Sequence, residues 1–484
     1  LKEVLNVDHV SVESDFFSIG GTSLLAIRYL ARASEVFQTS IAPADLFRAP
    51  TVAGLAELID RGQLSGRAQV ELPAMATGAA SGASRPLWRP LALARAEGEF
   101  DTIDAAAIAY LPDELMLVPG IRTQLAKLEE SGSSAFWTGV CHLPFGTIAL
   151  VVAPIGGRDL FNDPSVTRAM IGRSINYASR LGVRCMALTG LIPAATDLGL
   201  SLEAPDGISL TTGHAATAAS MGLTIAAVAA ATDRDLRDEV VSVVGLGAIG
   251  TASLQTMIAR VAHPRALTLC DVPGRRGYLE ALAHDIRVTH GFRGEIDIAI
   301  ATGRLPDKVY QSSFFVGATN VPDVIEIDRL KPGSIVVDDS FPLCFDLRVA
   351  KRRFDAAGDI VCVAGGSVSL DAPITWSLAL PPGFSAVVPG VRASALFPSS
   401  AAITGCILSS LVPQLGLRPT IGTASLNDCT DYWDGFARLG IKAAPLHCGD
   451  WALTTGDLYR FRAQAADPRP VLRGQDRTVA GAKL

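Results

Sequence analysis

Short hydrophobic runs alternate with longer amphipathic segments along most of the chain after about residue 93. Apolar runs rich in Val, Ile and Leu are typical of strands buried on both faces, and apolar residues spaced three or four apart are typical of helices. These patterns predict strands at 147–152, 186–190, 240–245, 266–270, 296–301, 314–319 and 334–337, and helices at 166–178, 215–230 and 252–261. Strands that alternate with helices indicate an α/β fold.

The first part of the chain has a different pattern. Leu24, Leu25, Ile27 and Leu30 follow at helical spacing directly after a Gly-Gly turn and Ser23. This pattern predicts a helix that begins at Ser23. The free amides and the positive dipole end of a helix N-terminus favour a phosphodiester, although a serine in this place can also act only as an N-cap.

The segment 15–24, with the sequence DFFSIGGTSL, resembles the attachment motif of peptidyl and acyl carrier domains, and the resemblance continues to about residue 60. It implies a small all-α, four-helix carrier domain over 1–62 in which Ser23 carries covalent phosphopantetheine. The Phe-Phe and Gly-Gly-Thr-Ser pattern is closer to the peptidyl class. The implied partners are an adenylating enzyme or other domains of a nonribosomal peptide synthetase assembly line, and a phosphopantetheinyl transferase. Because residue 1 is not Met, we expect a piece of a longer polypeptide or a trimmed chain.

Residues 63–93 form the predicted linker. The segment is rich in Gly, Ala, Ser and Pro and has little hydrophobic periodicity, as in ATGAASGAS at 76–84. Such a composition predicts a flexible tether, whose mean reach of about 30 Å would deliver a carrier to a neighbouring active site.

Composition narrows the class of protein. A chain of 484 residues predicts several domains, and a net charge of −6 gives no electrostatic footprint for nucleic acid. The longest apolar stretches, such as 223–231, are shorter than the ~20 residues of a membrane span. The eight cysteines have neither disulfide nor metal-site spacing. We therefore expect a cytoplasmic protein without a metal centre.

A glycine-rich turn joins a Val-rich strand to a helix at residues 245–250. Glycines in a GxGxxG pattern between a strand and a helix let a pyrophosphate approach the helix N-terminus, and an acidic residue about 20 positions later suits the ribose. The pattern predicts a Rossmann dinucleotide-binding domain over 237–375. The candidate cofactor-binding residues are Gly245, Gly247, Ala248, Ile249, Gly250, Asp271, Arg275, Arg276 and Asn320.

The choice of nicotinamide cofactor stays open at this point. Asp271 suits the ribose hydroxyls of NADH, whereas Arg275 and Arg276 suit the extra phosphate of NADPH. NADPH is favoured because biosynthetic reductions and the family named next use it.

No tyrosine in the chain has a lysine four positions later, which disfavours the short-chain reductases of peptide synthetases. Residues 149–445 instead resemble cyanobacterial long-chain acyl-carrier-protein reductase, which makes fatty aldehydes. The resemblance rests on the order and spacing of LTG at 188–190, TTGH at 211–214, VDDSFP at 337–342 and AGGSV at 364–368 around the glycine loop. It implies an N-terminal α/β substrate region over 94–236, completed by C-terminal helices over 376–456. The remaining residues 457–484 are predicted to be a loosely ordered tail.

That family transfers its acyl group to a cysteine, and Ala401 stands in the corresponding place, so we expect direct hydride attack on the carrier thioester. Cys406 is the alternative nucleophile, although its apolar neighbours favour a buried structural cysteine. His214 is the candidate oxyanion donor, with a structural role as the alternative. Ser399 and Ser400 are candidate donors that can also act as helix caps.

Two further motifs are given structural interpretations. The pair at 141–142, Cys then His, resembles a nucleophile beside a base, but neighbours in sequence do not face one another. Asp338 and Asp339 end a strand and are expected to be solvated turn carboxylates, with orienting a donor or lining the substrate channel as the alternative.

The sequence thus predicts an enzyme, an NAD(P)H-dependent thioester reductase that releases a carrier-bound acyl or aminoacyl group as an aldehyde. Two alternatives remain: a scaffold that no longer catalyses, and a dehydrogenase that acts on the tethered group without releasing it.

Overall fold

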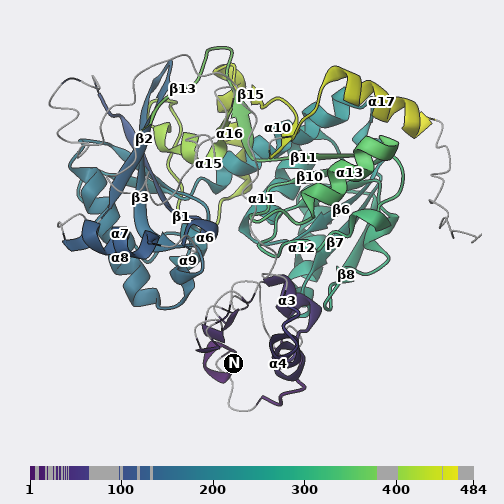
Figure 1. Ribbon diagram of the computed structural model, residues 1–484. Helices are drawn as coiled ribbons and strands as arrows, with labels where there is room; N and C mark the ends of the chain where they lie inside the picture. The colour runs from purple at the N-terminus through teal and green to yellow at the C-terminus, as the bar shows by residue number, and fades with distance from the viewer. Residues whose placement is uncertain are drawn as a thin grey trace, which may run out of the picture.

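Two six-stranded sheets with flanking helices form two lobes in the computed structural model of the protein (Figure 1). The structure describes residues 102–116, 120–130, 135–378, 402–449 and 451–466, together with residue 98 and parts of 1–64. Helix α10 (His214–Ala231) packs against elements of both lobes. The α/β architecture expected from the alternating pattern is confirmed.

The first sheet has the strand order β13-β2-β3-β1-β4-β5. Strands β1, β3, β4 and β5 are parallel, whereas β2 runs antiparallel to β3 and β13 antiparallel to β2. Helix α8 begins at an Asp163 N-cap followed by a proline, a typical helix start. The bounds are β1 Ala105–Leu111, β2 Phe136–Leu143, β3 Gly146–Gly156, β4 Cys185–Leu188, β5 Ser209–Thr211, β13 Thr375–Leu378, α6 Asp113–Met116, α7 Ile121–Glu130, α8 Pro164–Ser179 and α9 Ile192–Ala195.

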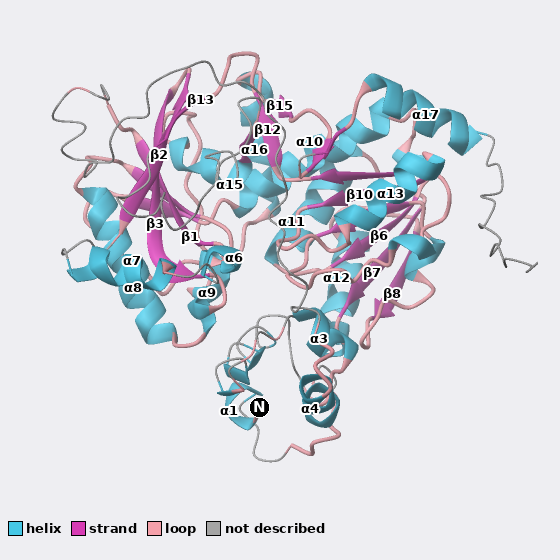
Figure 2. Ribbon diagram, in the orientation of Figure 1, coloured by secondary structure: helices cyan, strands magenta, loops and turns pink. Residues whose placement is uncertain are grey.

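The second sheet is fully parallel, with the order β11-β10-β9-β6-β7-β8 (Figure 2). Counted from its first strand β6, this is the order of the doubly wound dinucleotide-binding fold, with the switch point between β6 and β9. The bounds are β6 Val240–Val244, β7 Ala266–Asp271, β8 Glu295–Ile300, β9 Phe314–Gly317, β10 Ser334–Asp338, β11 Ile360–Ala364, α11 Ala248–Thr256 with a π-turn at Met257–Val261, α12 Arg276–Val288 and α13 Leu347–Ala357.

Helix α10 is apolar on all sides because it is a core helix. Its length and composition would suit a membrane span, but 72% of its apolar window is buried inside the protein. Two glycines permit the close packing: a Cβ on Gly365 would overlap Met221 of α10, and Gly222 of α10 lies against the ring of Trp433. A helix that is hydrophobic all round belongs in such an interior.

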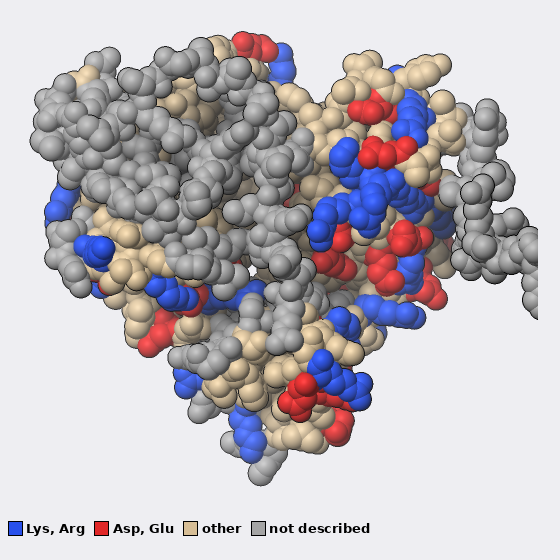
Figure 3. Space-filling model, viewed as in Figure 1, with Lys and Arg blue, Asp and Glu red and all other residues tan. Residues whose placement is uncertain are grey.

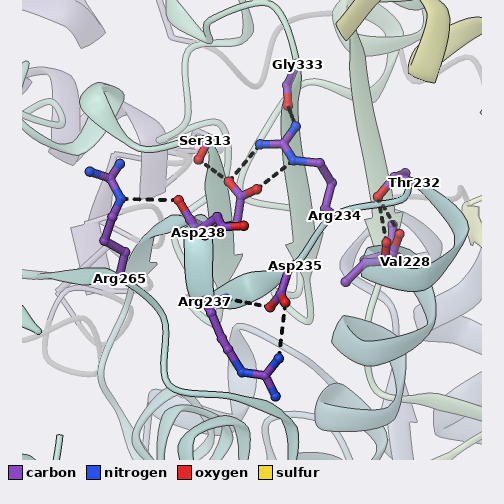
Figure 4. Close-up of polar contacts among 11 residues, drawn as sticks. Val228, Thr232, Arg234, Asp235, Arg237, Asp238, Arg265, Ser313 and Gly333 are labelled. Carbon is purple, nitrogen blue, oxygen red and sulfur yellow. Dashed lines mark hydrogen bonds and ion pairs between the residues drawn. The ribbon is translucent and has the colours of Figure 1, made fainter. Parts of the chain in front are cut away.

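The connection from α10 into the second sheet is held by a buried ion pair (Figure 4). Arg234 donates two hydrogen bonds to Glu239, at 2.6 and 2.7 Å, and a third to the carbonyl of Gly333. Ser313 donates to the same carboxylate. A bidentate ion pair fixes the relative orientation of its two side chains as well as pairing their charges. Because Glu239 directly precedes β6, the pair sets where that strand begins.

The C-terminal segments return to both lobes. Strands β12 (Ser367–Ser369), β14 (Ile403–Thr404) and β15 (Lys442–Ala443) form a small sheet, followed by the hairpin of β16 (His447–Cys448) and β17 (Trp451–Ala452). Helix α15 (Gly405–Leu408) and helix α16 (Leu426–Arg438) both pack on α10. Short 3-10 turns lie at Asp159–Phe161, Leu236–Asp238, Pro273–Arg275, Val309–Gln311, Ile327–Arg329 and Ser409–Leu411.

The prediction of a loosely ordered tail over 457–484 is wrong for the first part of that segment. Helix α17 (Thr455–Ala466) covers the first part of that segment, and Phe461 is fully buried in the core of the dinucleotide-binding lobe. Arg460 and Arg462 of the same helix also bind Asp355 and Asp233, so distant contacts order a segment whose polar sequence predicts none.

The N-terminal segment contains helices α1 (Lys2–Leu5), α3 (Pro43–Arg48) and α4 (Val52–Asp60), drawn below the lobes in Figure 1. Thr51 caps α4 by accepting from the backbone of Gly54. Phe16 is buried and stacks with Tyr29. The four-helix arrangement of this part remains a prediction.

Charges of both signs intermix over the dinucleotide-binding lobe (Figure 3). On the described part of this face, basic side chains near α13 lie beside acidic ones. Mixed charge of this kind does not form the one-sign surface that nucleic acid requires.

We predict that Phe354→Ala destabilises the dinucleotide-binding lobe. Phe354 is 1% exposed on α13, with its ring centroid 5.0 Å from that of Trp451. Truncating a buried Phe costs about 3–5 kcal/mol, which denaturant unfolding would measure. Arg352→Ala, an exposed change on the same helix, is the matched control and is expected to stay within about 0.5 kcal/mol of the wild type. Equal losses in both variants would contradict this account.

Candidate active site

The glycine loop between β6 and α11 has the shape that a pyrophosphate requires. Gly245 has a φ of 86°, and a Cβ on Gly250 would overlap the carbonyl oxygen of Gly245. Gly247, by contrast, is exposed and has open space where its Cβ would stand. Ala248 and Ile249 begin helix α11, whose free amides face this space. The loop therefore fits a dinucleotide, with Gly247 at the point of closest approach.

Asp271 ties the end of β7 to this loop. Its carboxylate accepts from the backbone N–H of Leu246 at 3.0 Å and from that of Val272 at 2.8 Å. Burial raises the pKa of Asp271, and these two bonds with Arg275 oppose that rise. The carboxylate thus has a structural role in the loop in addition to any contact with a ribose.

Two arginines follow Asp271 in the chain, and their side chains differ in how firmly contacts within the protein hold them. Arg275 donates to the carbonyl of Leu246 at 2.7 Å, and its guanidinium lies 3.8 Å from the ring centre of Tyr278. Arg276 has a 60% exposed side chain, and its nearest acidic partner is Glu280 at 3.9 Å. Arg275 is therefore largely committed to the loop, whereas Arg276 can turn towards a ligand.

A hollow lies at the carboxyl ends of the strands on either side of the switch point. This is the place where ligands bind in open α/β sheets. Asn320, half-buried after β9, lies between two of the lining residues in sequence, and its predicted place near the nicotinamide stays a prediction. The lining residues are Val244, Gly245, Cys270, Asp271, Val272, Ala301, Leu305, Thr319, Val321 and Val324.

Cys406 lies where the two lobes meet. Its side chain is half-buried, while the other seven cysteines are buried. Backbone N–H groups of Ile407 and of Gly190, just after β4, donate to its sulfur, and the thiol is 3.4 Å from the hydroxyl of Thr404. A Cβ on Gly213 would stand 2.6 Å from the Cys406 Cα, so the start of α10 touches the cysteine. Burial is nevertheless the largest cause that raises the pKa of the Cys406 thiol, so the choice between a structural cysteine and a nucleophile stays a prediction.

His214, the first residue of α10, is buried and neutral. Burial lowers the pKa of His214 to about 4, and only a bond to the backbone of Gly422 opposes this. That bond favours the protonated form, so the ring donates to the Gly422 carbonyl, and Nδ1 is left buried without a partner. This arrangement fits the structural role given as the alternative, with Nδ1 as an acceptor in this tautomer, and the donor role stays a prediction.

Asp338 and Asp339 are not solvated turn carboxylates. Asp338 is 1% exposed and accepts from the backbones of Ser340 and Cys344, which holds the turn after β10. Asp339 is half-buried against Gly366, where a Cβ would overlap its Oδ1. Both carboxyls end the strand that lies beside β9, so they stand at the ligand-binding edge of the sheet.

Several predicted residues are not brought into the site. Cys141 and His142 point to opposite faces of β2: burial raises the pKa of Cys141 to about 12, and His142 bonds to Ser377 at 3.0 Å. Ser23, Ser399 and Ser400 lie outside the described residues.

Sequence reasoning missed that Gly190 and Gly213 lie against Cys406 and that the charge of Asp339 acts on its thiol. The motifs LTG, TTGH and VDDSFP did contain these residues. The available signal was that each of these three motifs carries one of the residues. Spacing along the chain does not show which backbone N–H group reaches which sulfur.

Residues 1–59 match the phosphopantetheine attachment site family. The same region is 40% identical over 76 residues to a dimodular nonribosomal peptide synthase of Bacillus subtilis strain 168, covering 16% of this chain and 3% of that protein. It is 47% identical over 55 residues to a probable non-canonical nonribosomal peptide synthetase of Salinispora arenicola, covering 11% of this chain and 1% of that protein. The N-terminal segment is therefore a carrier domain of the peptide synthetase type, and the chain spans only a few per cent of these relatives.

Solved structures resemble the remainder only distantly. L-tryptophan dehydrogenase from Nostoc punctiforme has a TM-score of 0.33 and 12% identity, over 76% of this chain and 89% of that one. Quinate dehydrogenase from Corynebacterium glutamicum in complex with NAD has a TM-score of 0.30 and 16% identity, over 69% of this chain and 100% of that one. At these scores the likeness carries no argument about chemistry, and the fold assignment rests on the strand order.

We predict that Gly247→Ala weakens nicotinamide binding without unfolding the protein. A methyl group there meets nothing within 4 Å in the free protein, so any loss must come from the ligand. We expect the dissociation constant, measured by fluorescence titration, to rise about tenfold or more. Gly277→Ala in α12, also with nothing within 4 Å, is the control. If Gly247→Ala binds as the wild type does, the loop is not the pyrophosphate site.

We predict that His214 makes stability depend on acid pH. Its pKa is about 4 when folded and about 6.5 when unfolded, so the unfolded chain binds more protons in between. Stability should therefore fall as pH drops through this window, by about 3 kcal/mol. Unfolding of the wild type and of His214→Gln at pH 7 and pH 4.5 would measure this, and the variant should lose less between the two pH values. Equal losses would contradict the assignment.

Proposed function

We propose that the protein reductively releases an acyl or aminoacyl group from its own carrier domain as an aldehyde, in natural-product biosynthesis. The carrier motif supplies a thioester on the phosphopantetheine of Ser23, and the dinucleotide-binding lobe is suited to a nicotinamide. The observation that carries the proposal is the half-buried Cys406 thiol, which has backbone N–H donors at its sulfur and stands at the junction of the lobes.

The acyl group is proposed to pass first to Cys406, in place of the direct hydride attack expected from the sequence. Among the eight cysteines, Cys406 alone is not classed as buried, and it lies against the start of α10 at Gly213. The Cys406 sulfur attacks the thioester carbonyl, and the phosphopantetheine thiol leaves with the proton that the cysteine gives up. The N–H groups of Gly190 and Ile407 stabilise negative charge as it develops on the sulfur.

A bound nicotinamide supplies the hydride that reduces the Cys406 thioester. The resulting hemithioacetal anion collapses to the aldehyde, and the cysteine sulfur leaves and regains a proton. The unpartnered Nδ1 of His214, as an acceptor, can orient an N–H of the substrate near this point. Water is excluded from one side by the Gly213 contact, which leaves no room between α10 and Cys406.

The proposed reductant is NADPH, with NADH as the alternative. Arg276 is exposed and close to the end of β7, where an extra ribose phosphate would lie. Asp271 opposes a phosphate if it is ionised, but burial raises its pKa and its oxygens already accept two backbone bonds. Parallel titrations with the two cofactors decide between them.

We predict that Cys406 becomes acylated when the cofactor is withheld. The carrier is loaded at Ser23 with an aminoacyl phosphopantetheine, and peptide mass spectrometry locates the acyl mass. Adding NADPH or NADH should then discharge it as an aldehyde. Cys406→Ala should retain the acyl group on Ser23 and lower aldehyde formation about 10³-fold or more.

The buried Cys429→Ala is the matched control, and Ser23→Ala should prevent loading altogether. Aldehyde formation at the wild-type rate by Cys406→Ala would restore direct hydride attack. An acyl-carrier that survives both cofactors across a panel of substrates would favour the scaffold, and a modified but still tethered group would favour a dehydrogenase that does not release its substrate.

A further inference from the structure

One of the two backbone N–H donors at the Cys406 sulfur comes from a distant part of the chain. Ile407 follows Cys406 on α15, so its N–H is placed by the same helix turn. Gly190 instead follows β4, and its backbone has a left-handed φ of 59°. Because glycine has more backbone freedom than other residues, its N–H stays at the sulfur only if the loop after β4 is held in place.

The ring of Tyr110 fills the space beside Gly190. A Cβ on Gly190 would stand 2.8 Å from Cε1 and 2.9 Å from the hydroxyl oxygen of Tyr110. The other edge of the ring lies against Gly157, where a Cβ would stand 2.9 Å from Cε2. A side chain at either position would overlap the ring, so the ring is wedged between two glycines.

Tyr110 reaches both glycines because of its place in the first sheet. Strand β1 lies between β3 and β4, and Gly157 and Gly190 follow the carboxyl ends of these two neighbours. The pairing of β1 with β3 shifts register between Tyr110 and Leu111. Such an irregularity, as at a β-bulge, changes the direction of a side chain and is common next to active sites.

Hydrogen bonds fasten both loops to β1 on either side of the ring. Thr189, which precedes Gly190, donates its N–H and its hydroxyl to the carbonyl of Ile108, at 3.0 and 2.8 Å. The N–H of Gly157 donates to the carbonyl of Leu111 at 3.2 Å. These bonds hold the loops next to β1, and the ring then sets the conformation of Gly190 itself.

From this placement we propose that Tyr110 is a positioning residue for Cys406, because its ring holds Gly190 with its N–H directed at the sulfur. The inference rests on the proposed function, in which that sulfur is first the nucleophile and later the leaving group. A donor that is fixed before the substrate binds stabilises the thiolate in both steps without reorganisation. The ring acts by its shape, and Tyr110 keeps its proton throughout.

A smaller side chain in place of Tyr110 would leave a space between the two glycine loops. Gly190 could then leave its left-handed conformation, and its N–H would turn away from the sulfur. A hydrogen bond to a thiolate is a bond to a charged group, so its loss affects the ionised sulfur more than the neutral thiol. The Cys406 thiol would become less acidic and its thiolate a poorer leaving group.

The test compares Tyr110→Leu, which removes the ring, with Tyr110→Phe, which keeps it, in the full chain. Alkylation of Cys406 by iodoacetamide is followed by peptide mass spectrometry from pH 6 to pH 10. In Tyr110→Leu this profile should shift to higher pH by about one unit, which is a tenfold change in ionisation. Single-turnover acyl transfer from Ser23 to Cys406 should slow about tenfold or more. Tyr110→Phe should stay within about threefold of the wild type in both readouts, because the N–H keeps its bond to the sulfur.

The matched control is Tyr177→Leu, which makes the same change in a tyrosine of α8 that packs on the same hydrophobic core as Tyr110. It should lower thermal stability without moving the alkylation profile, as expected for a residue with a structural role alone. Thermal unfolding and nicotinamide titration check that each variant is folded, and Tyr110→Met provides a second variant without the ring.

An alkylation profile that does not shift in folded Tyr110→Leu or Tyr110→Met would overturn the inference. Equal shifts in Tyr110→Leu and Tyr110→Phe would also overturn it, because they would assign the effect to the hydroxyl. If the wild-type protein forms no Cys406 thioester at all, the proposed function fails and removes the positioning role with it. If the wild type forms the thioester and the profiles of wild type and Tyr110→Leu coincide, only the inference fails.

Discussion

The contact between the start of α10 and α15 is the constraint on which the arrangement of the two lobes depends. A Cβ on Gly213 would stand 2.6 Å from Cys406, and one on Gly405 would stand 2.6 Å from the hydroxyl of Ser220. The backbone of Gly213 thus lies against that of Cys406, and the backbone of Gly405 lies against the Ser220 hydroxyl and the Ala216 carbonyl. This close approach brings Gly190, just after β4, and the start of α10 to the same cysteine.

Burial has a consistent effect on the ionisable groups at this junction. It raises the pKa of Cys406 and of Asp339 and lowers that of His214, so each group is biased towards its neutral form. A site whose ionisable groups are neutral attracts a charged ligand only weakly. A charge that develops there during a reaction is costly in free energy unless nearby dipoles stabilise it. The N–H groups of Gly190 and Ile407 are such dipoles, and they are fixed before any substrate arrives.

The glycine loop of the dinucleotide-binding lobe differs from this junction, because its geometry depends on contacts within one local unit of the chain. Gly245, Gly250 and Asp271 make their contacts within a strand, a turn, a helix and the next strand. The buried pair of Arg234 and Glu239 then fixes this unit to the end of α10. The position of the glycine loop relative to Cys406 therefore depends on α10, which belongs to neither sheet.

The sequence by itself determined the most apolar strands and helices, such as β3, β6 and α10, and the glycine loop, because those features depend on local hydrophobic spacing and backbone freedom. It also determined the carrier motif, whose likeness to peptide synthetases covers a contiguous segment. Only the tertiary structure decided the state of Cys406, His214 and Asp339. Their neighbours Gly190, Gly422 and Gly366 are distant in sequence, and burial and hydrogen bonding, which set a pKa, depend on which distant residues meet.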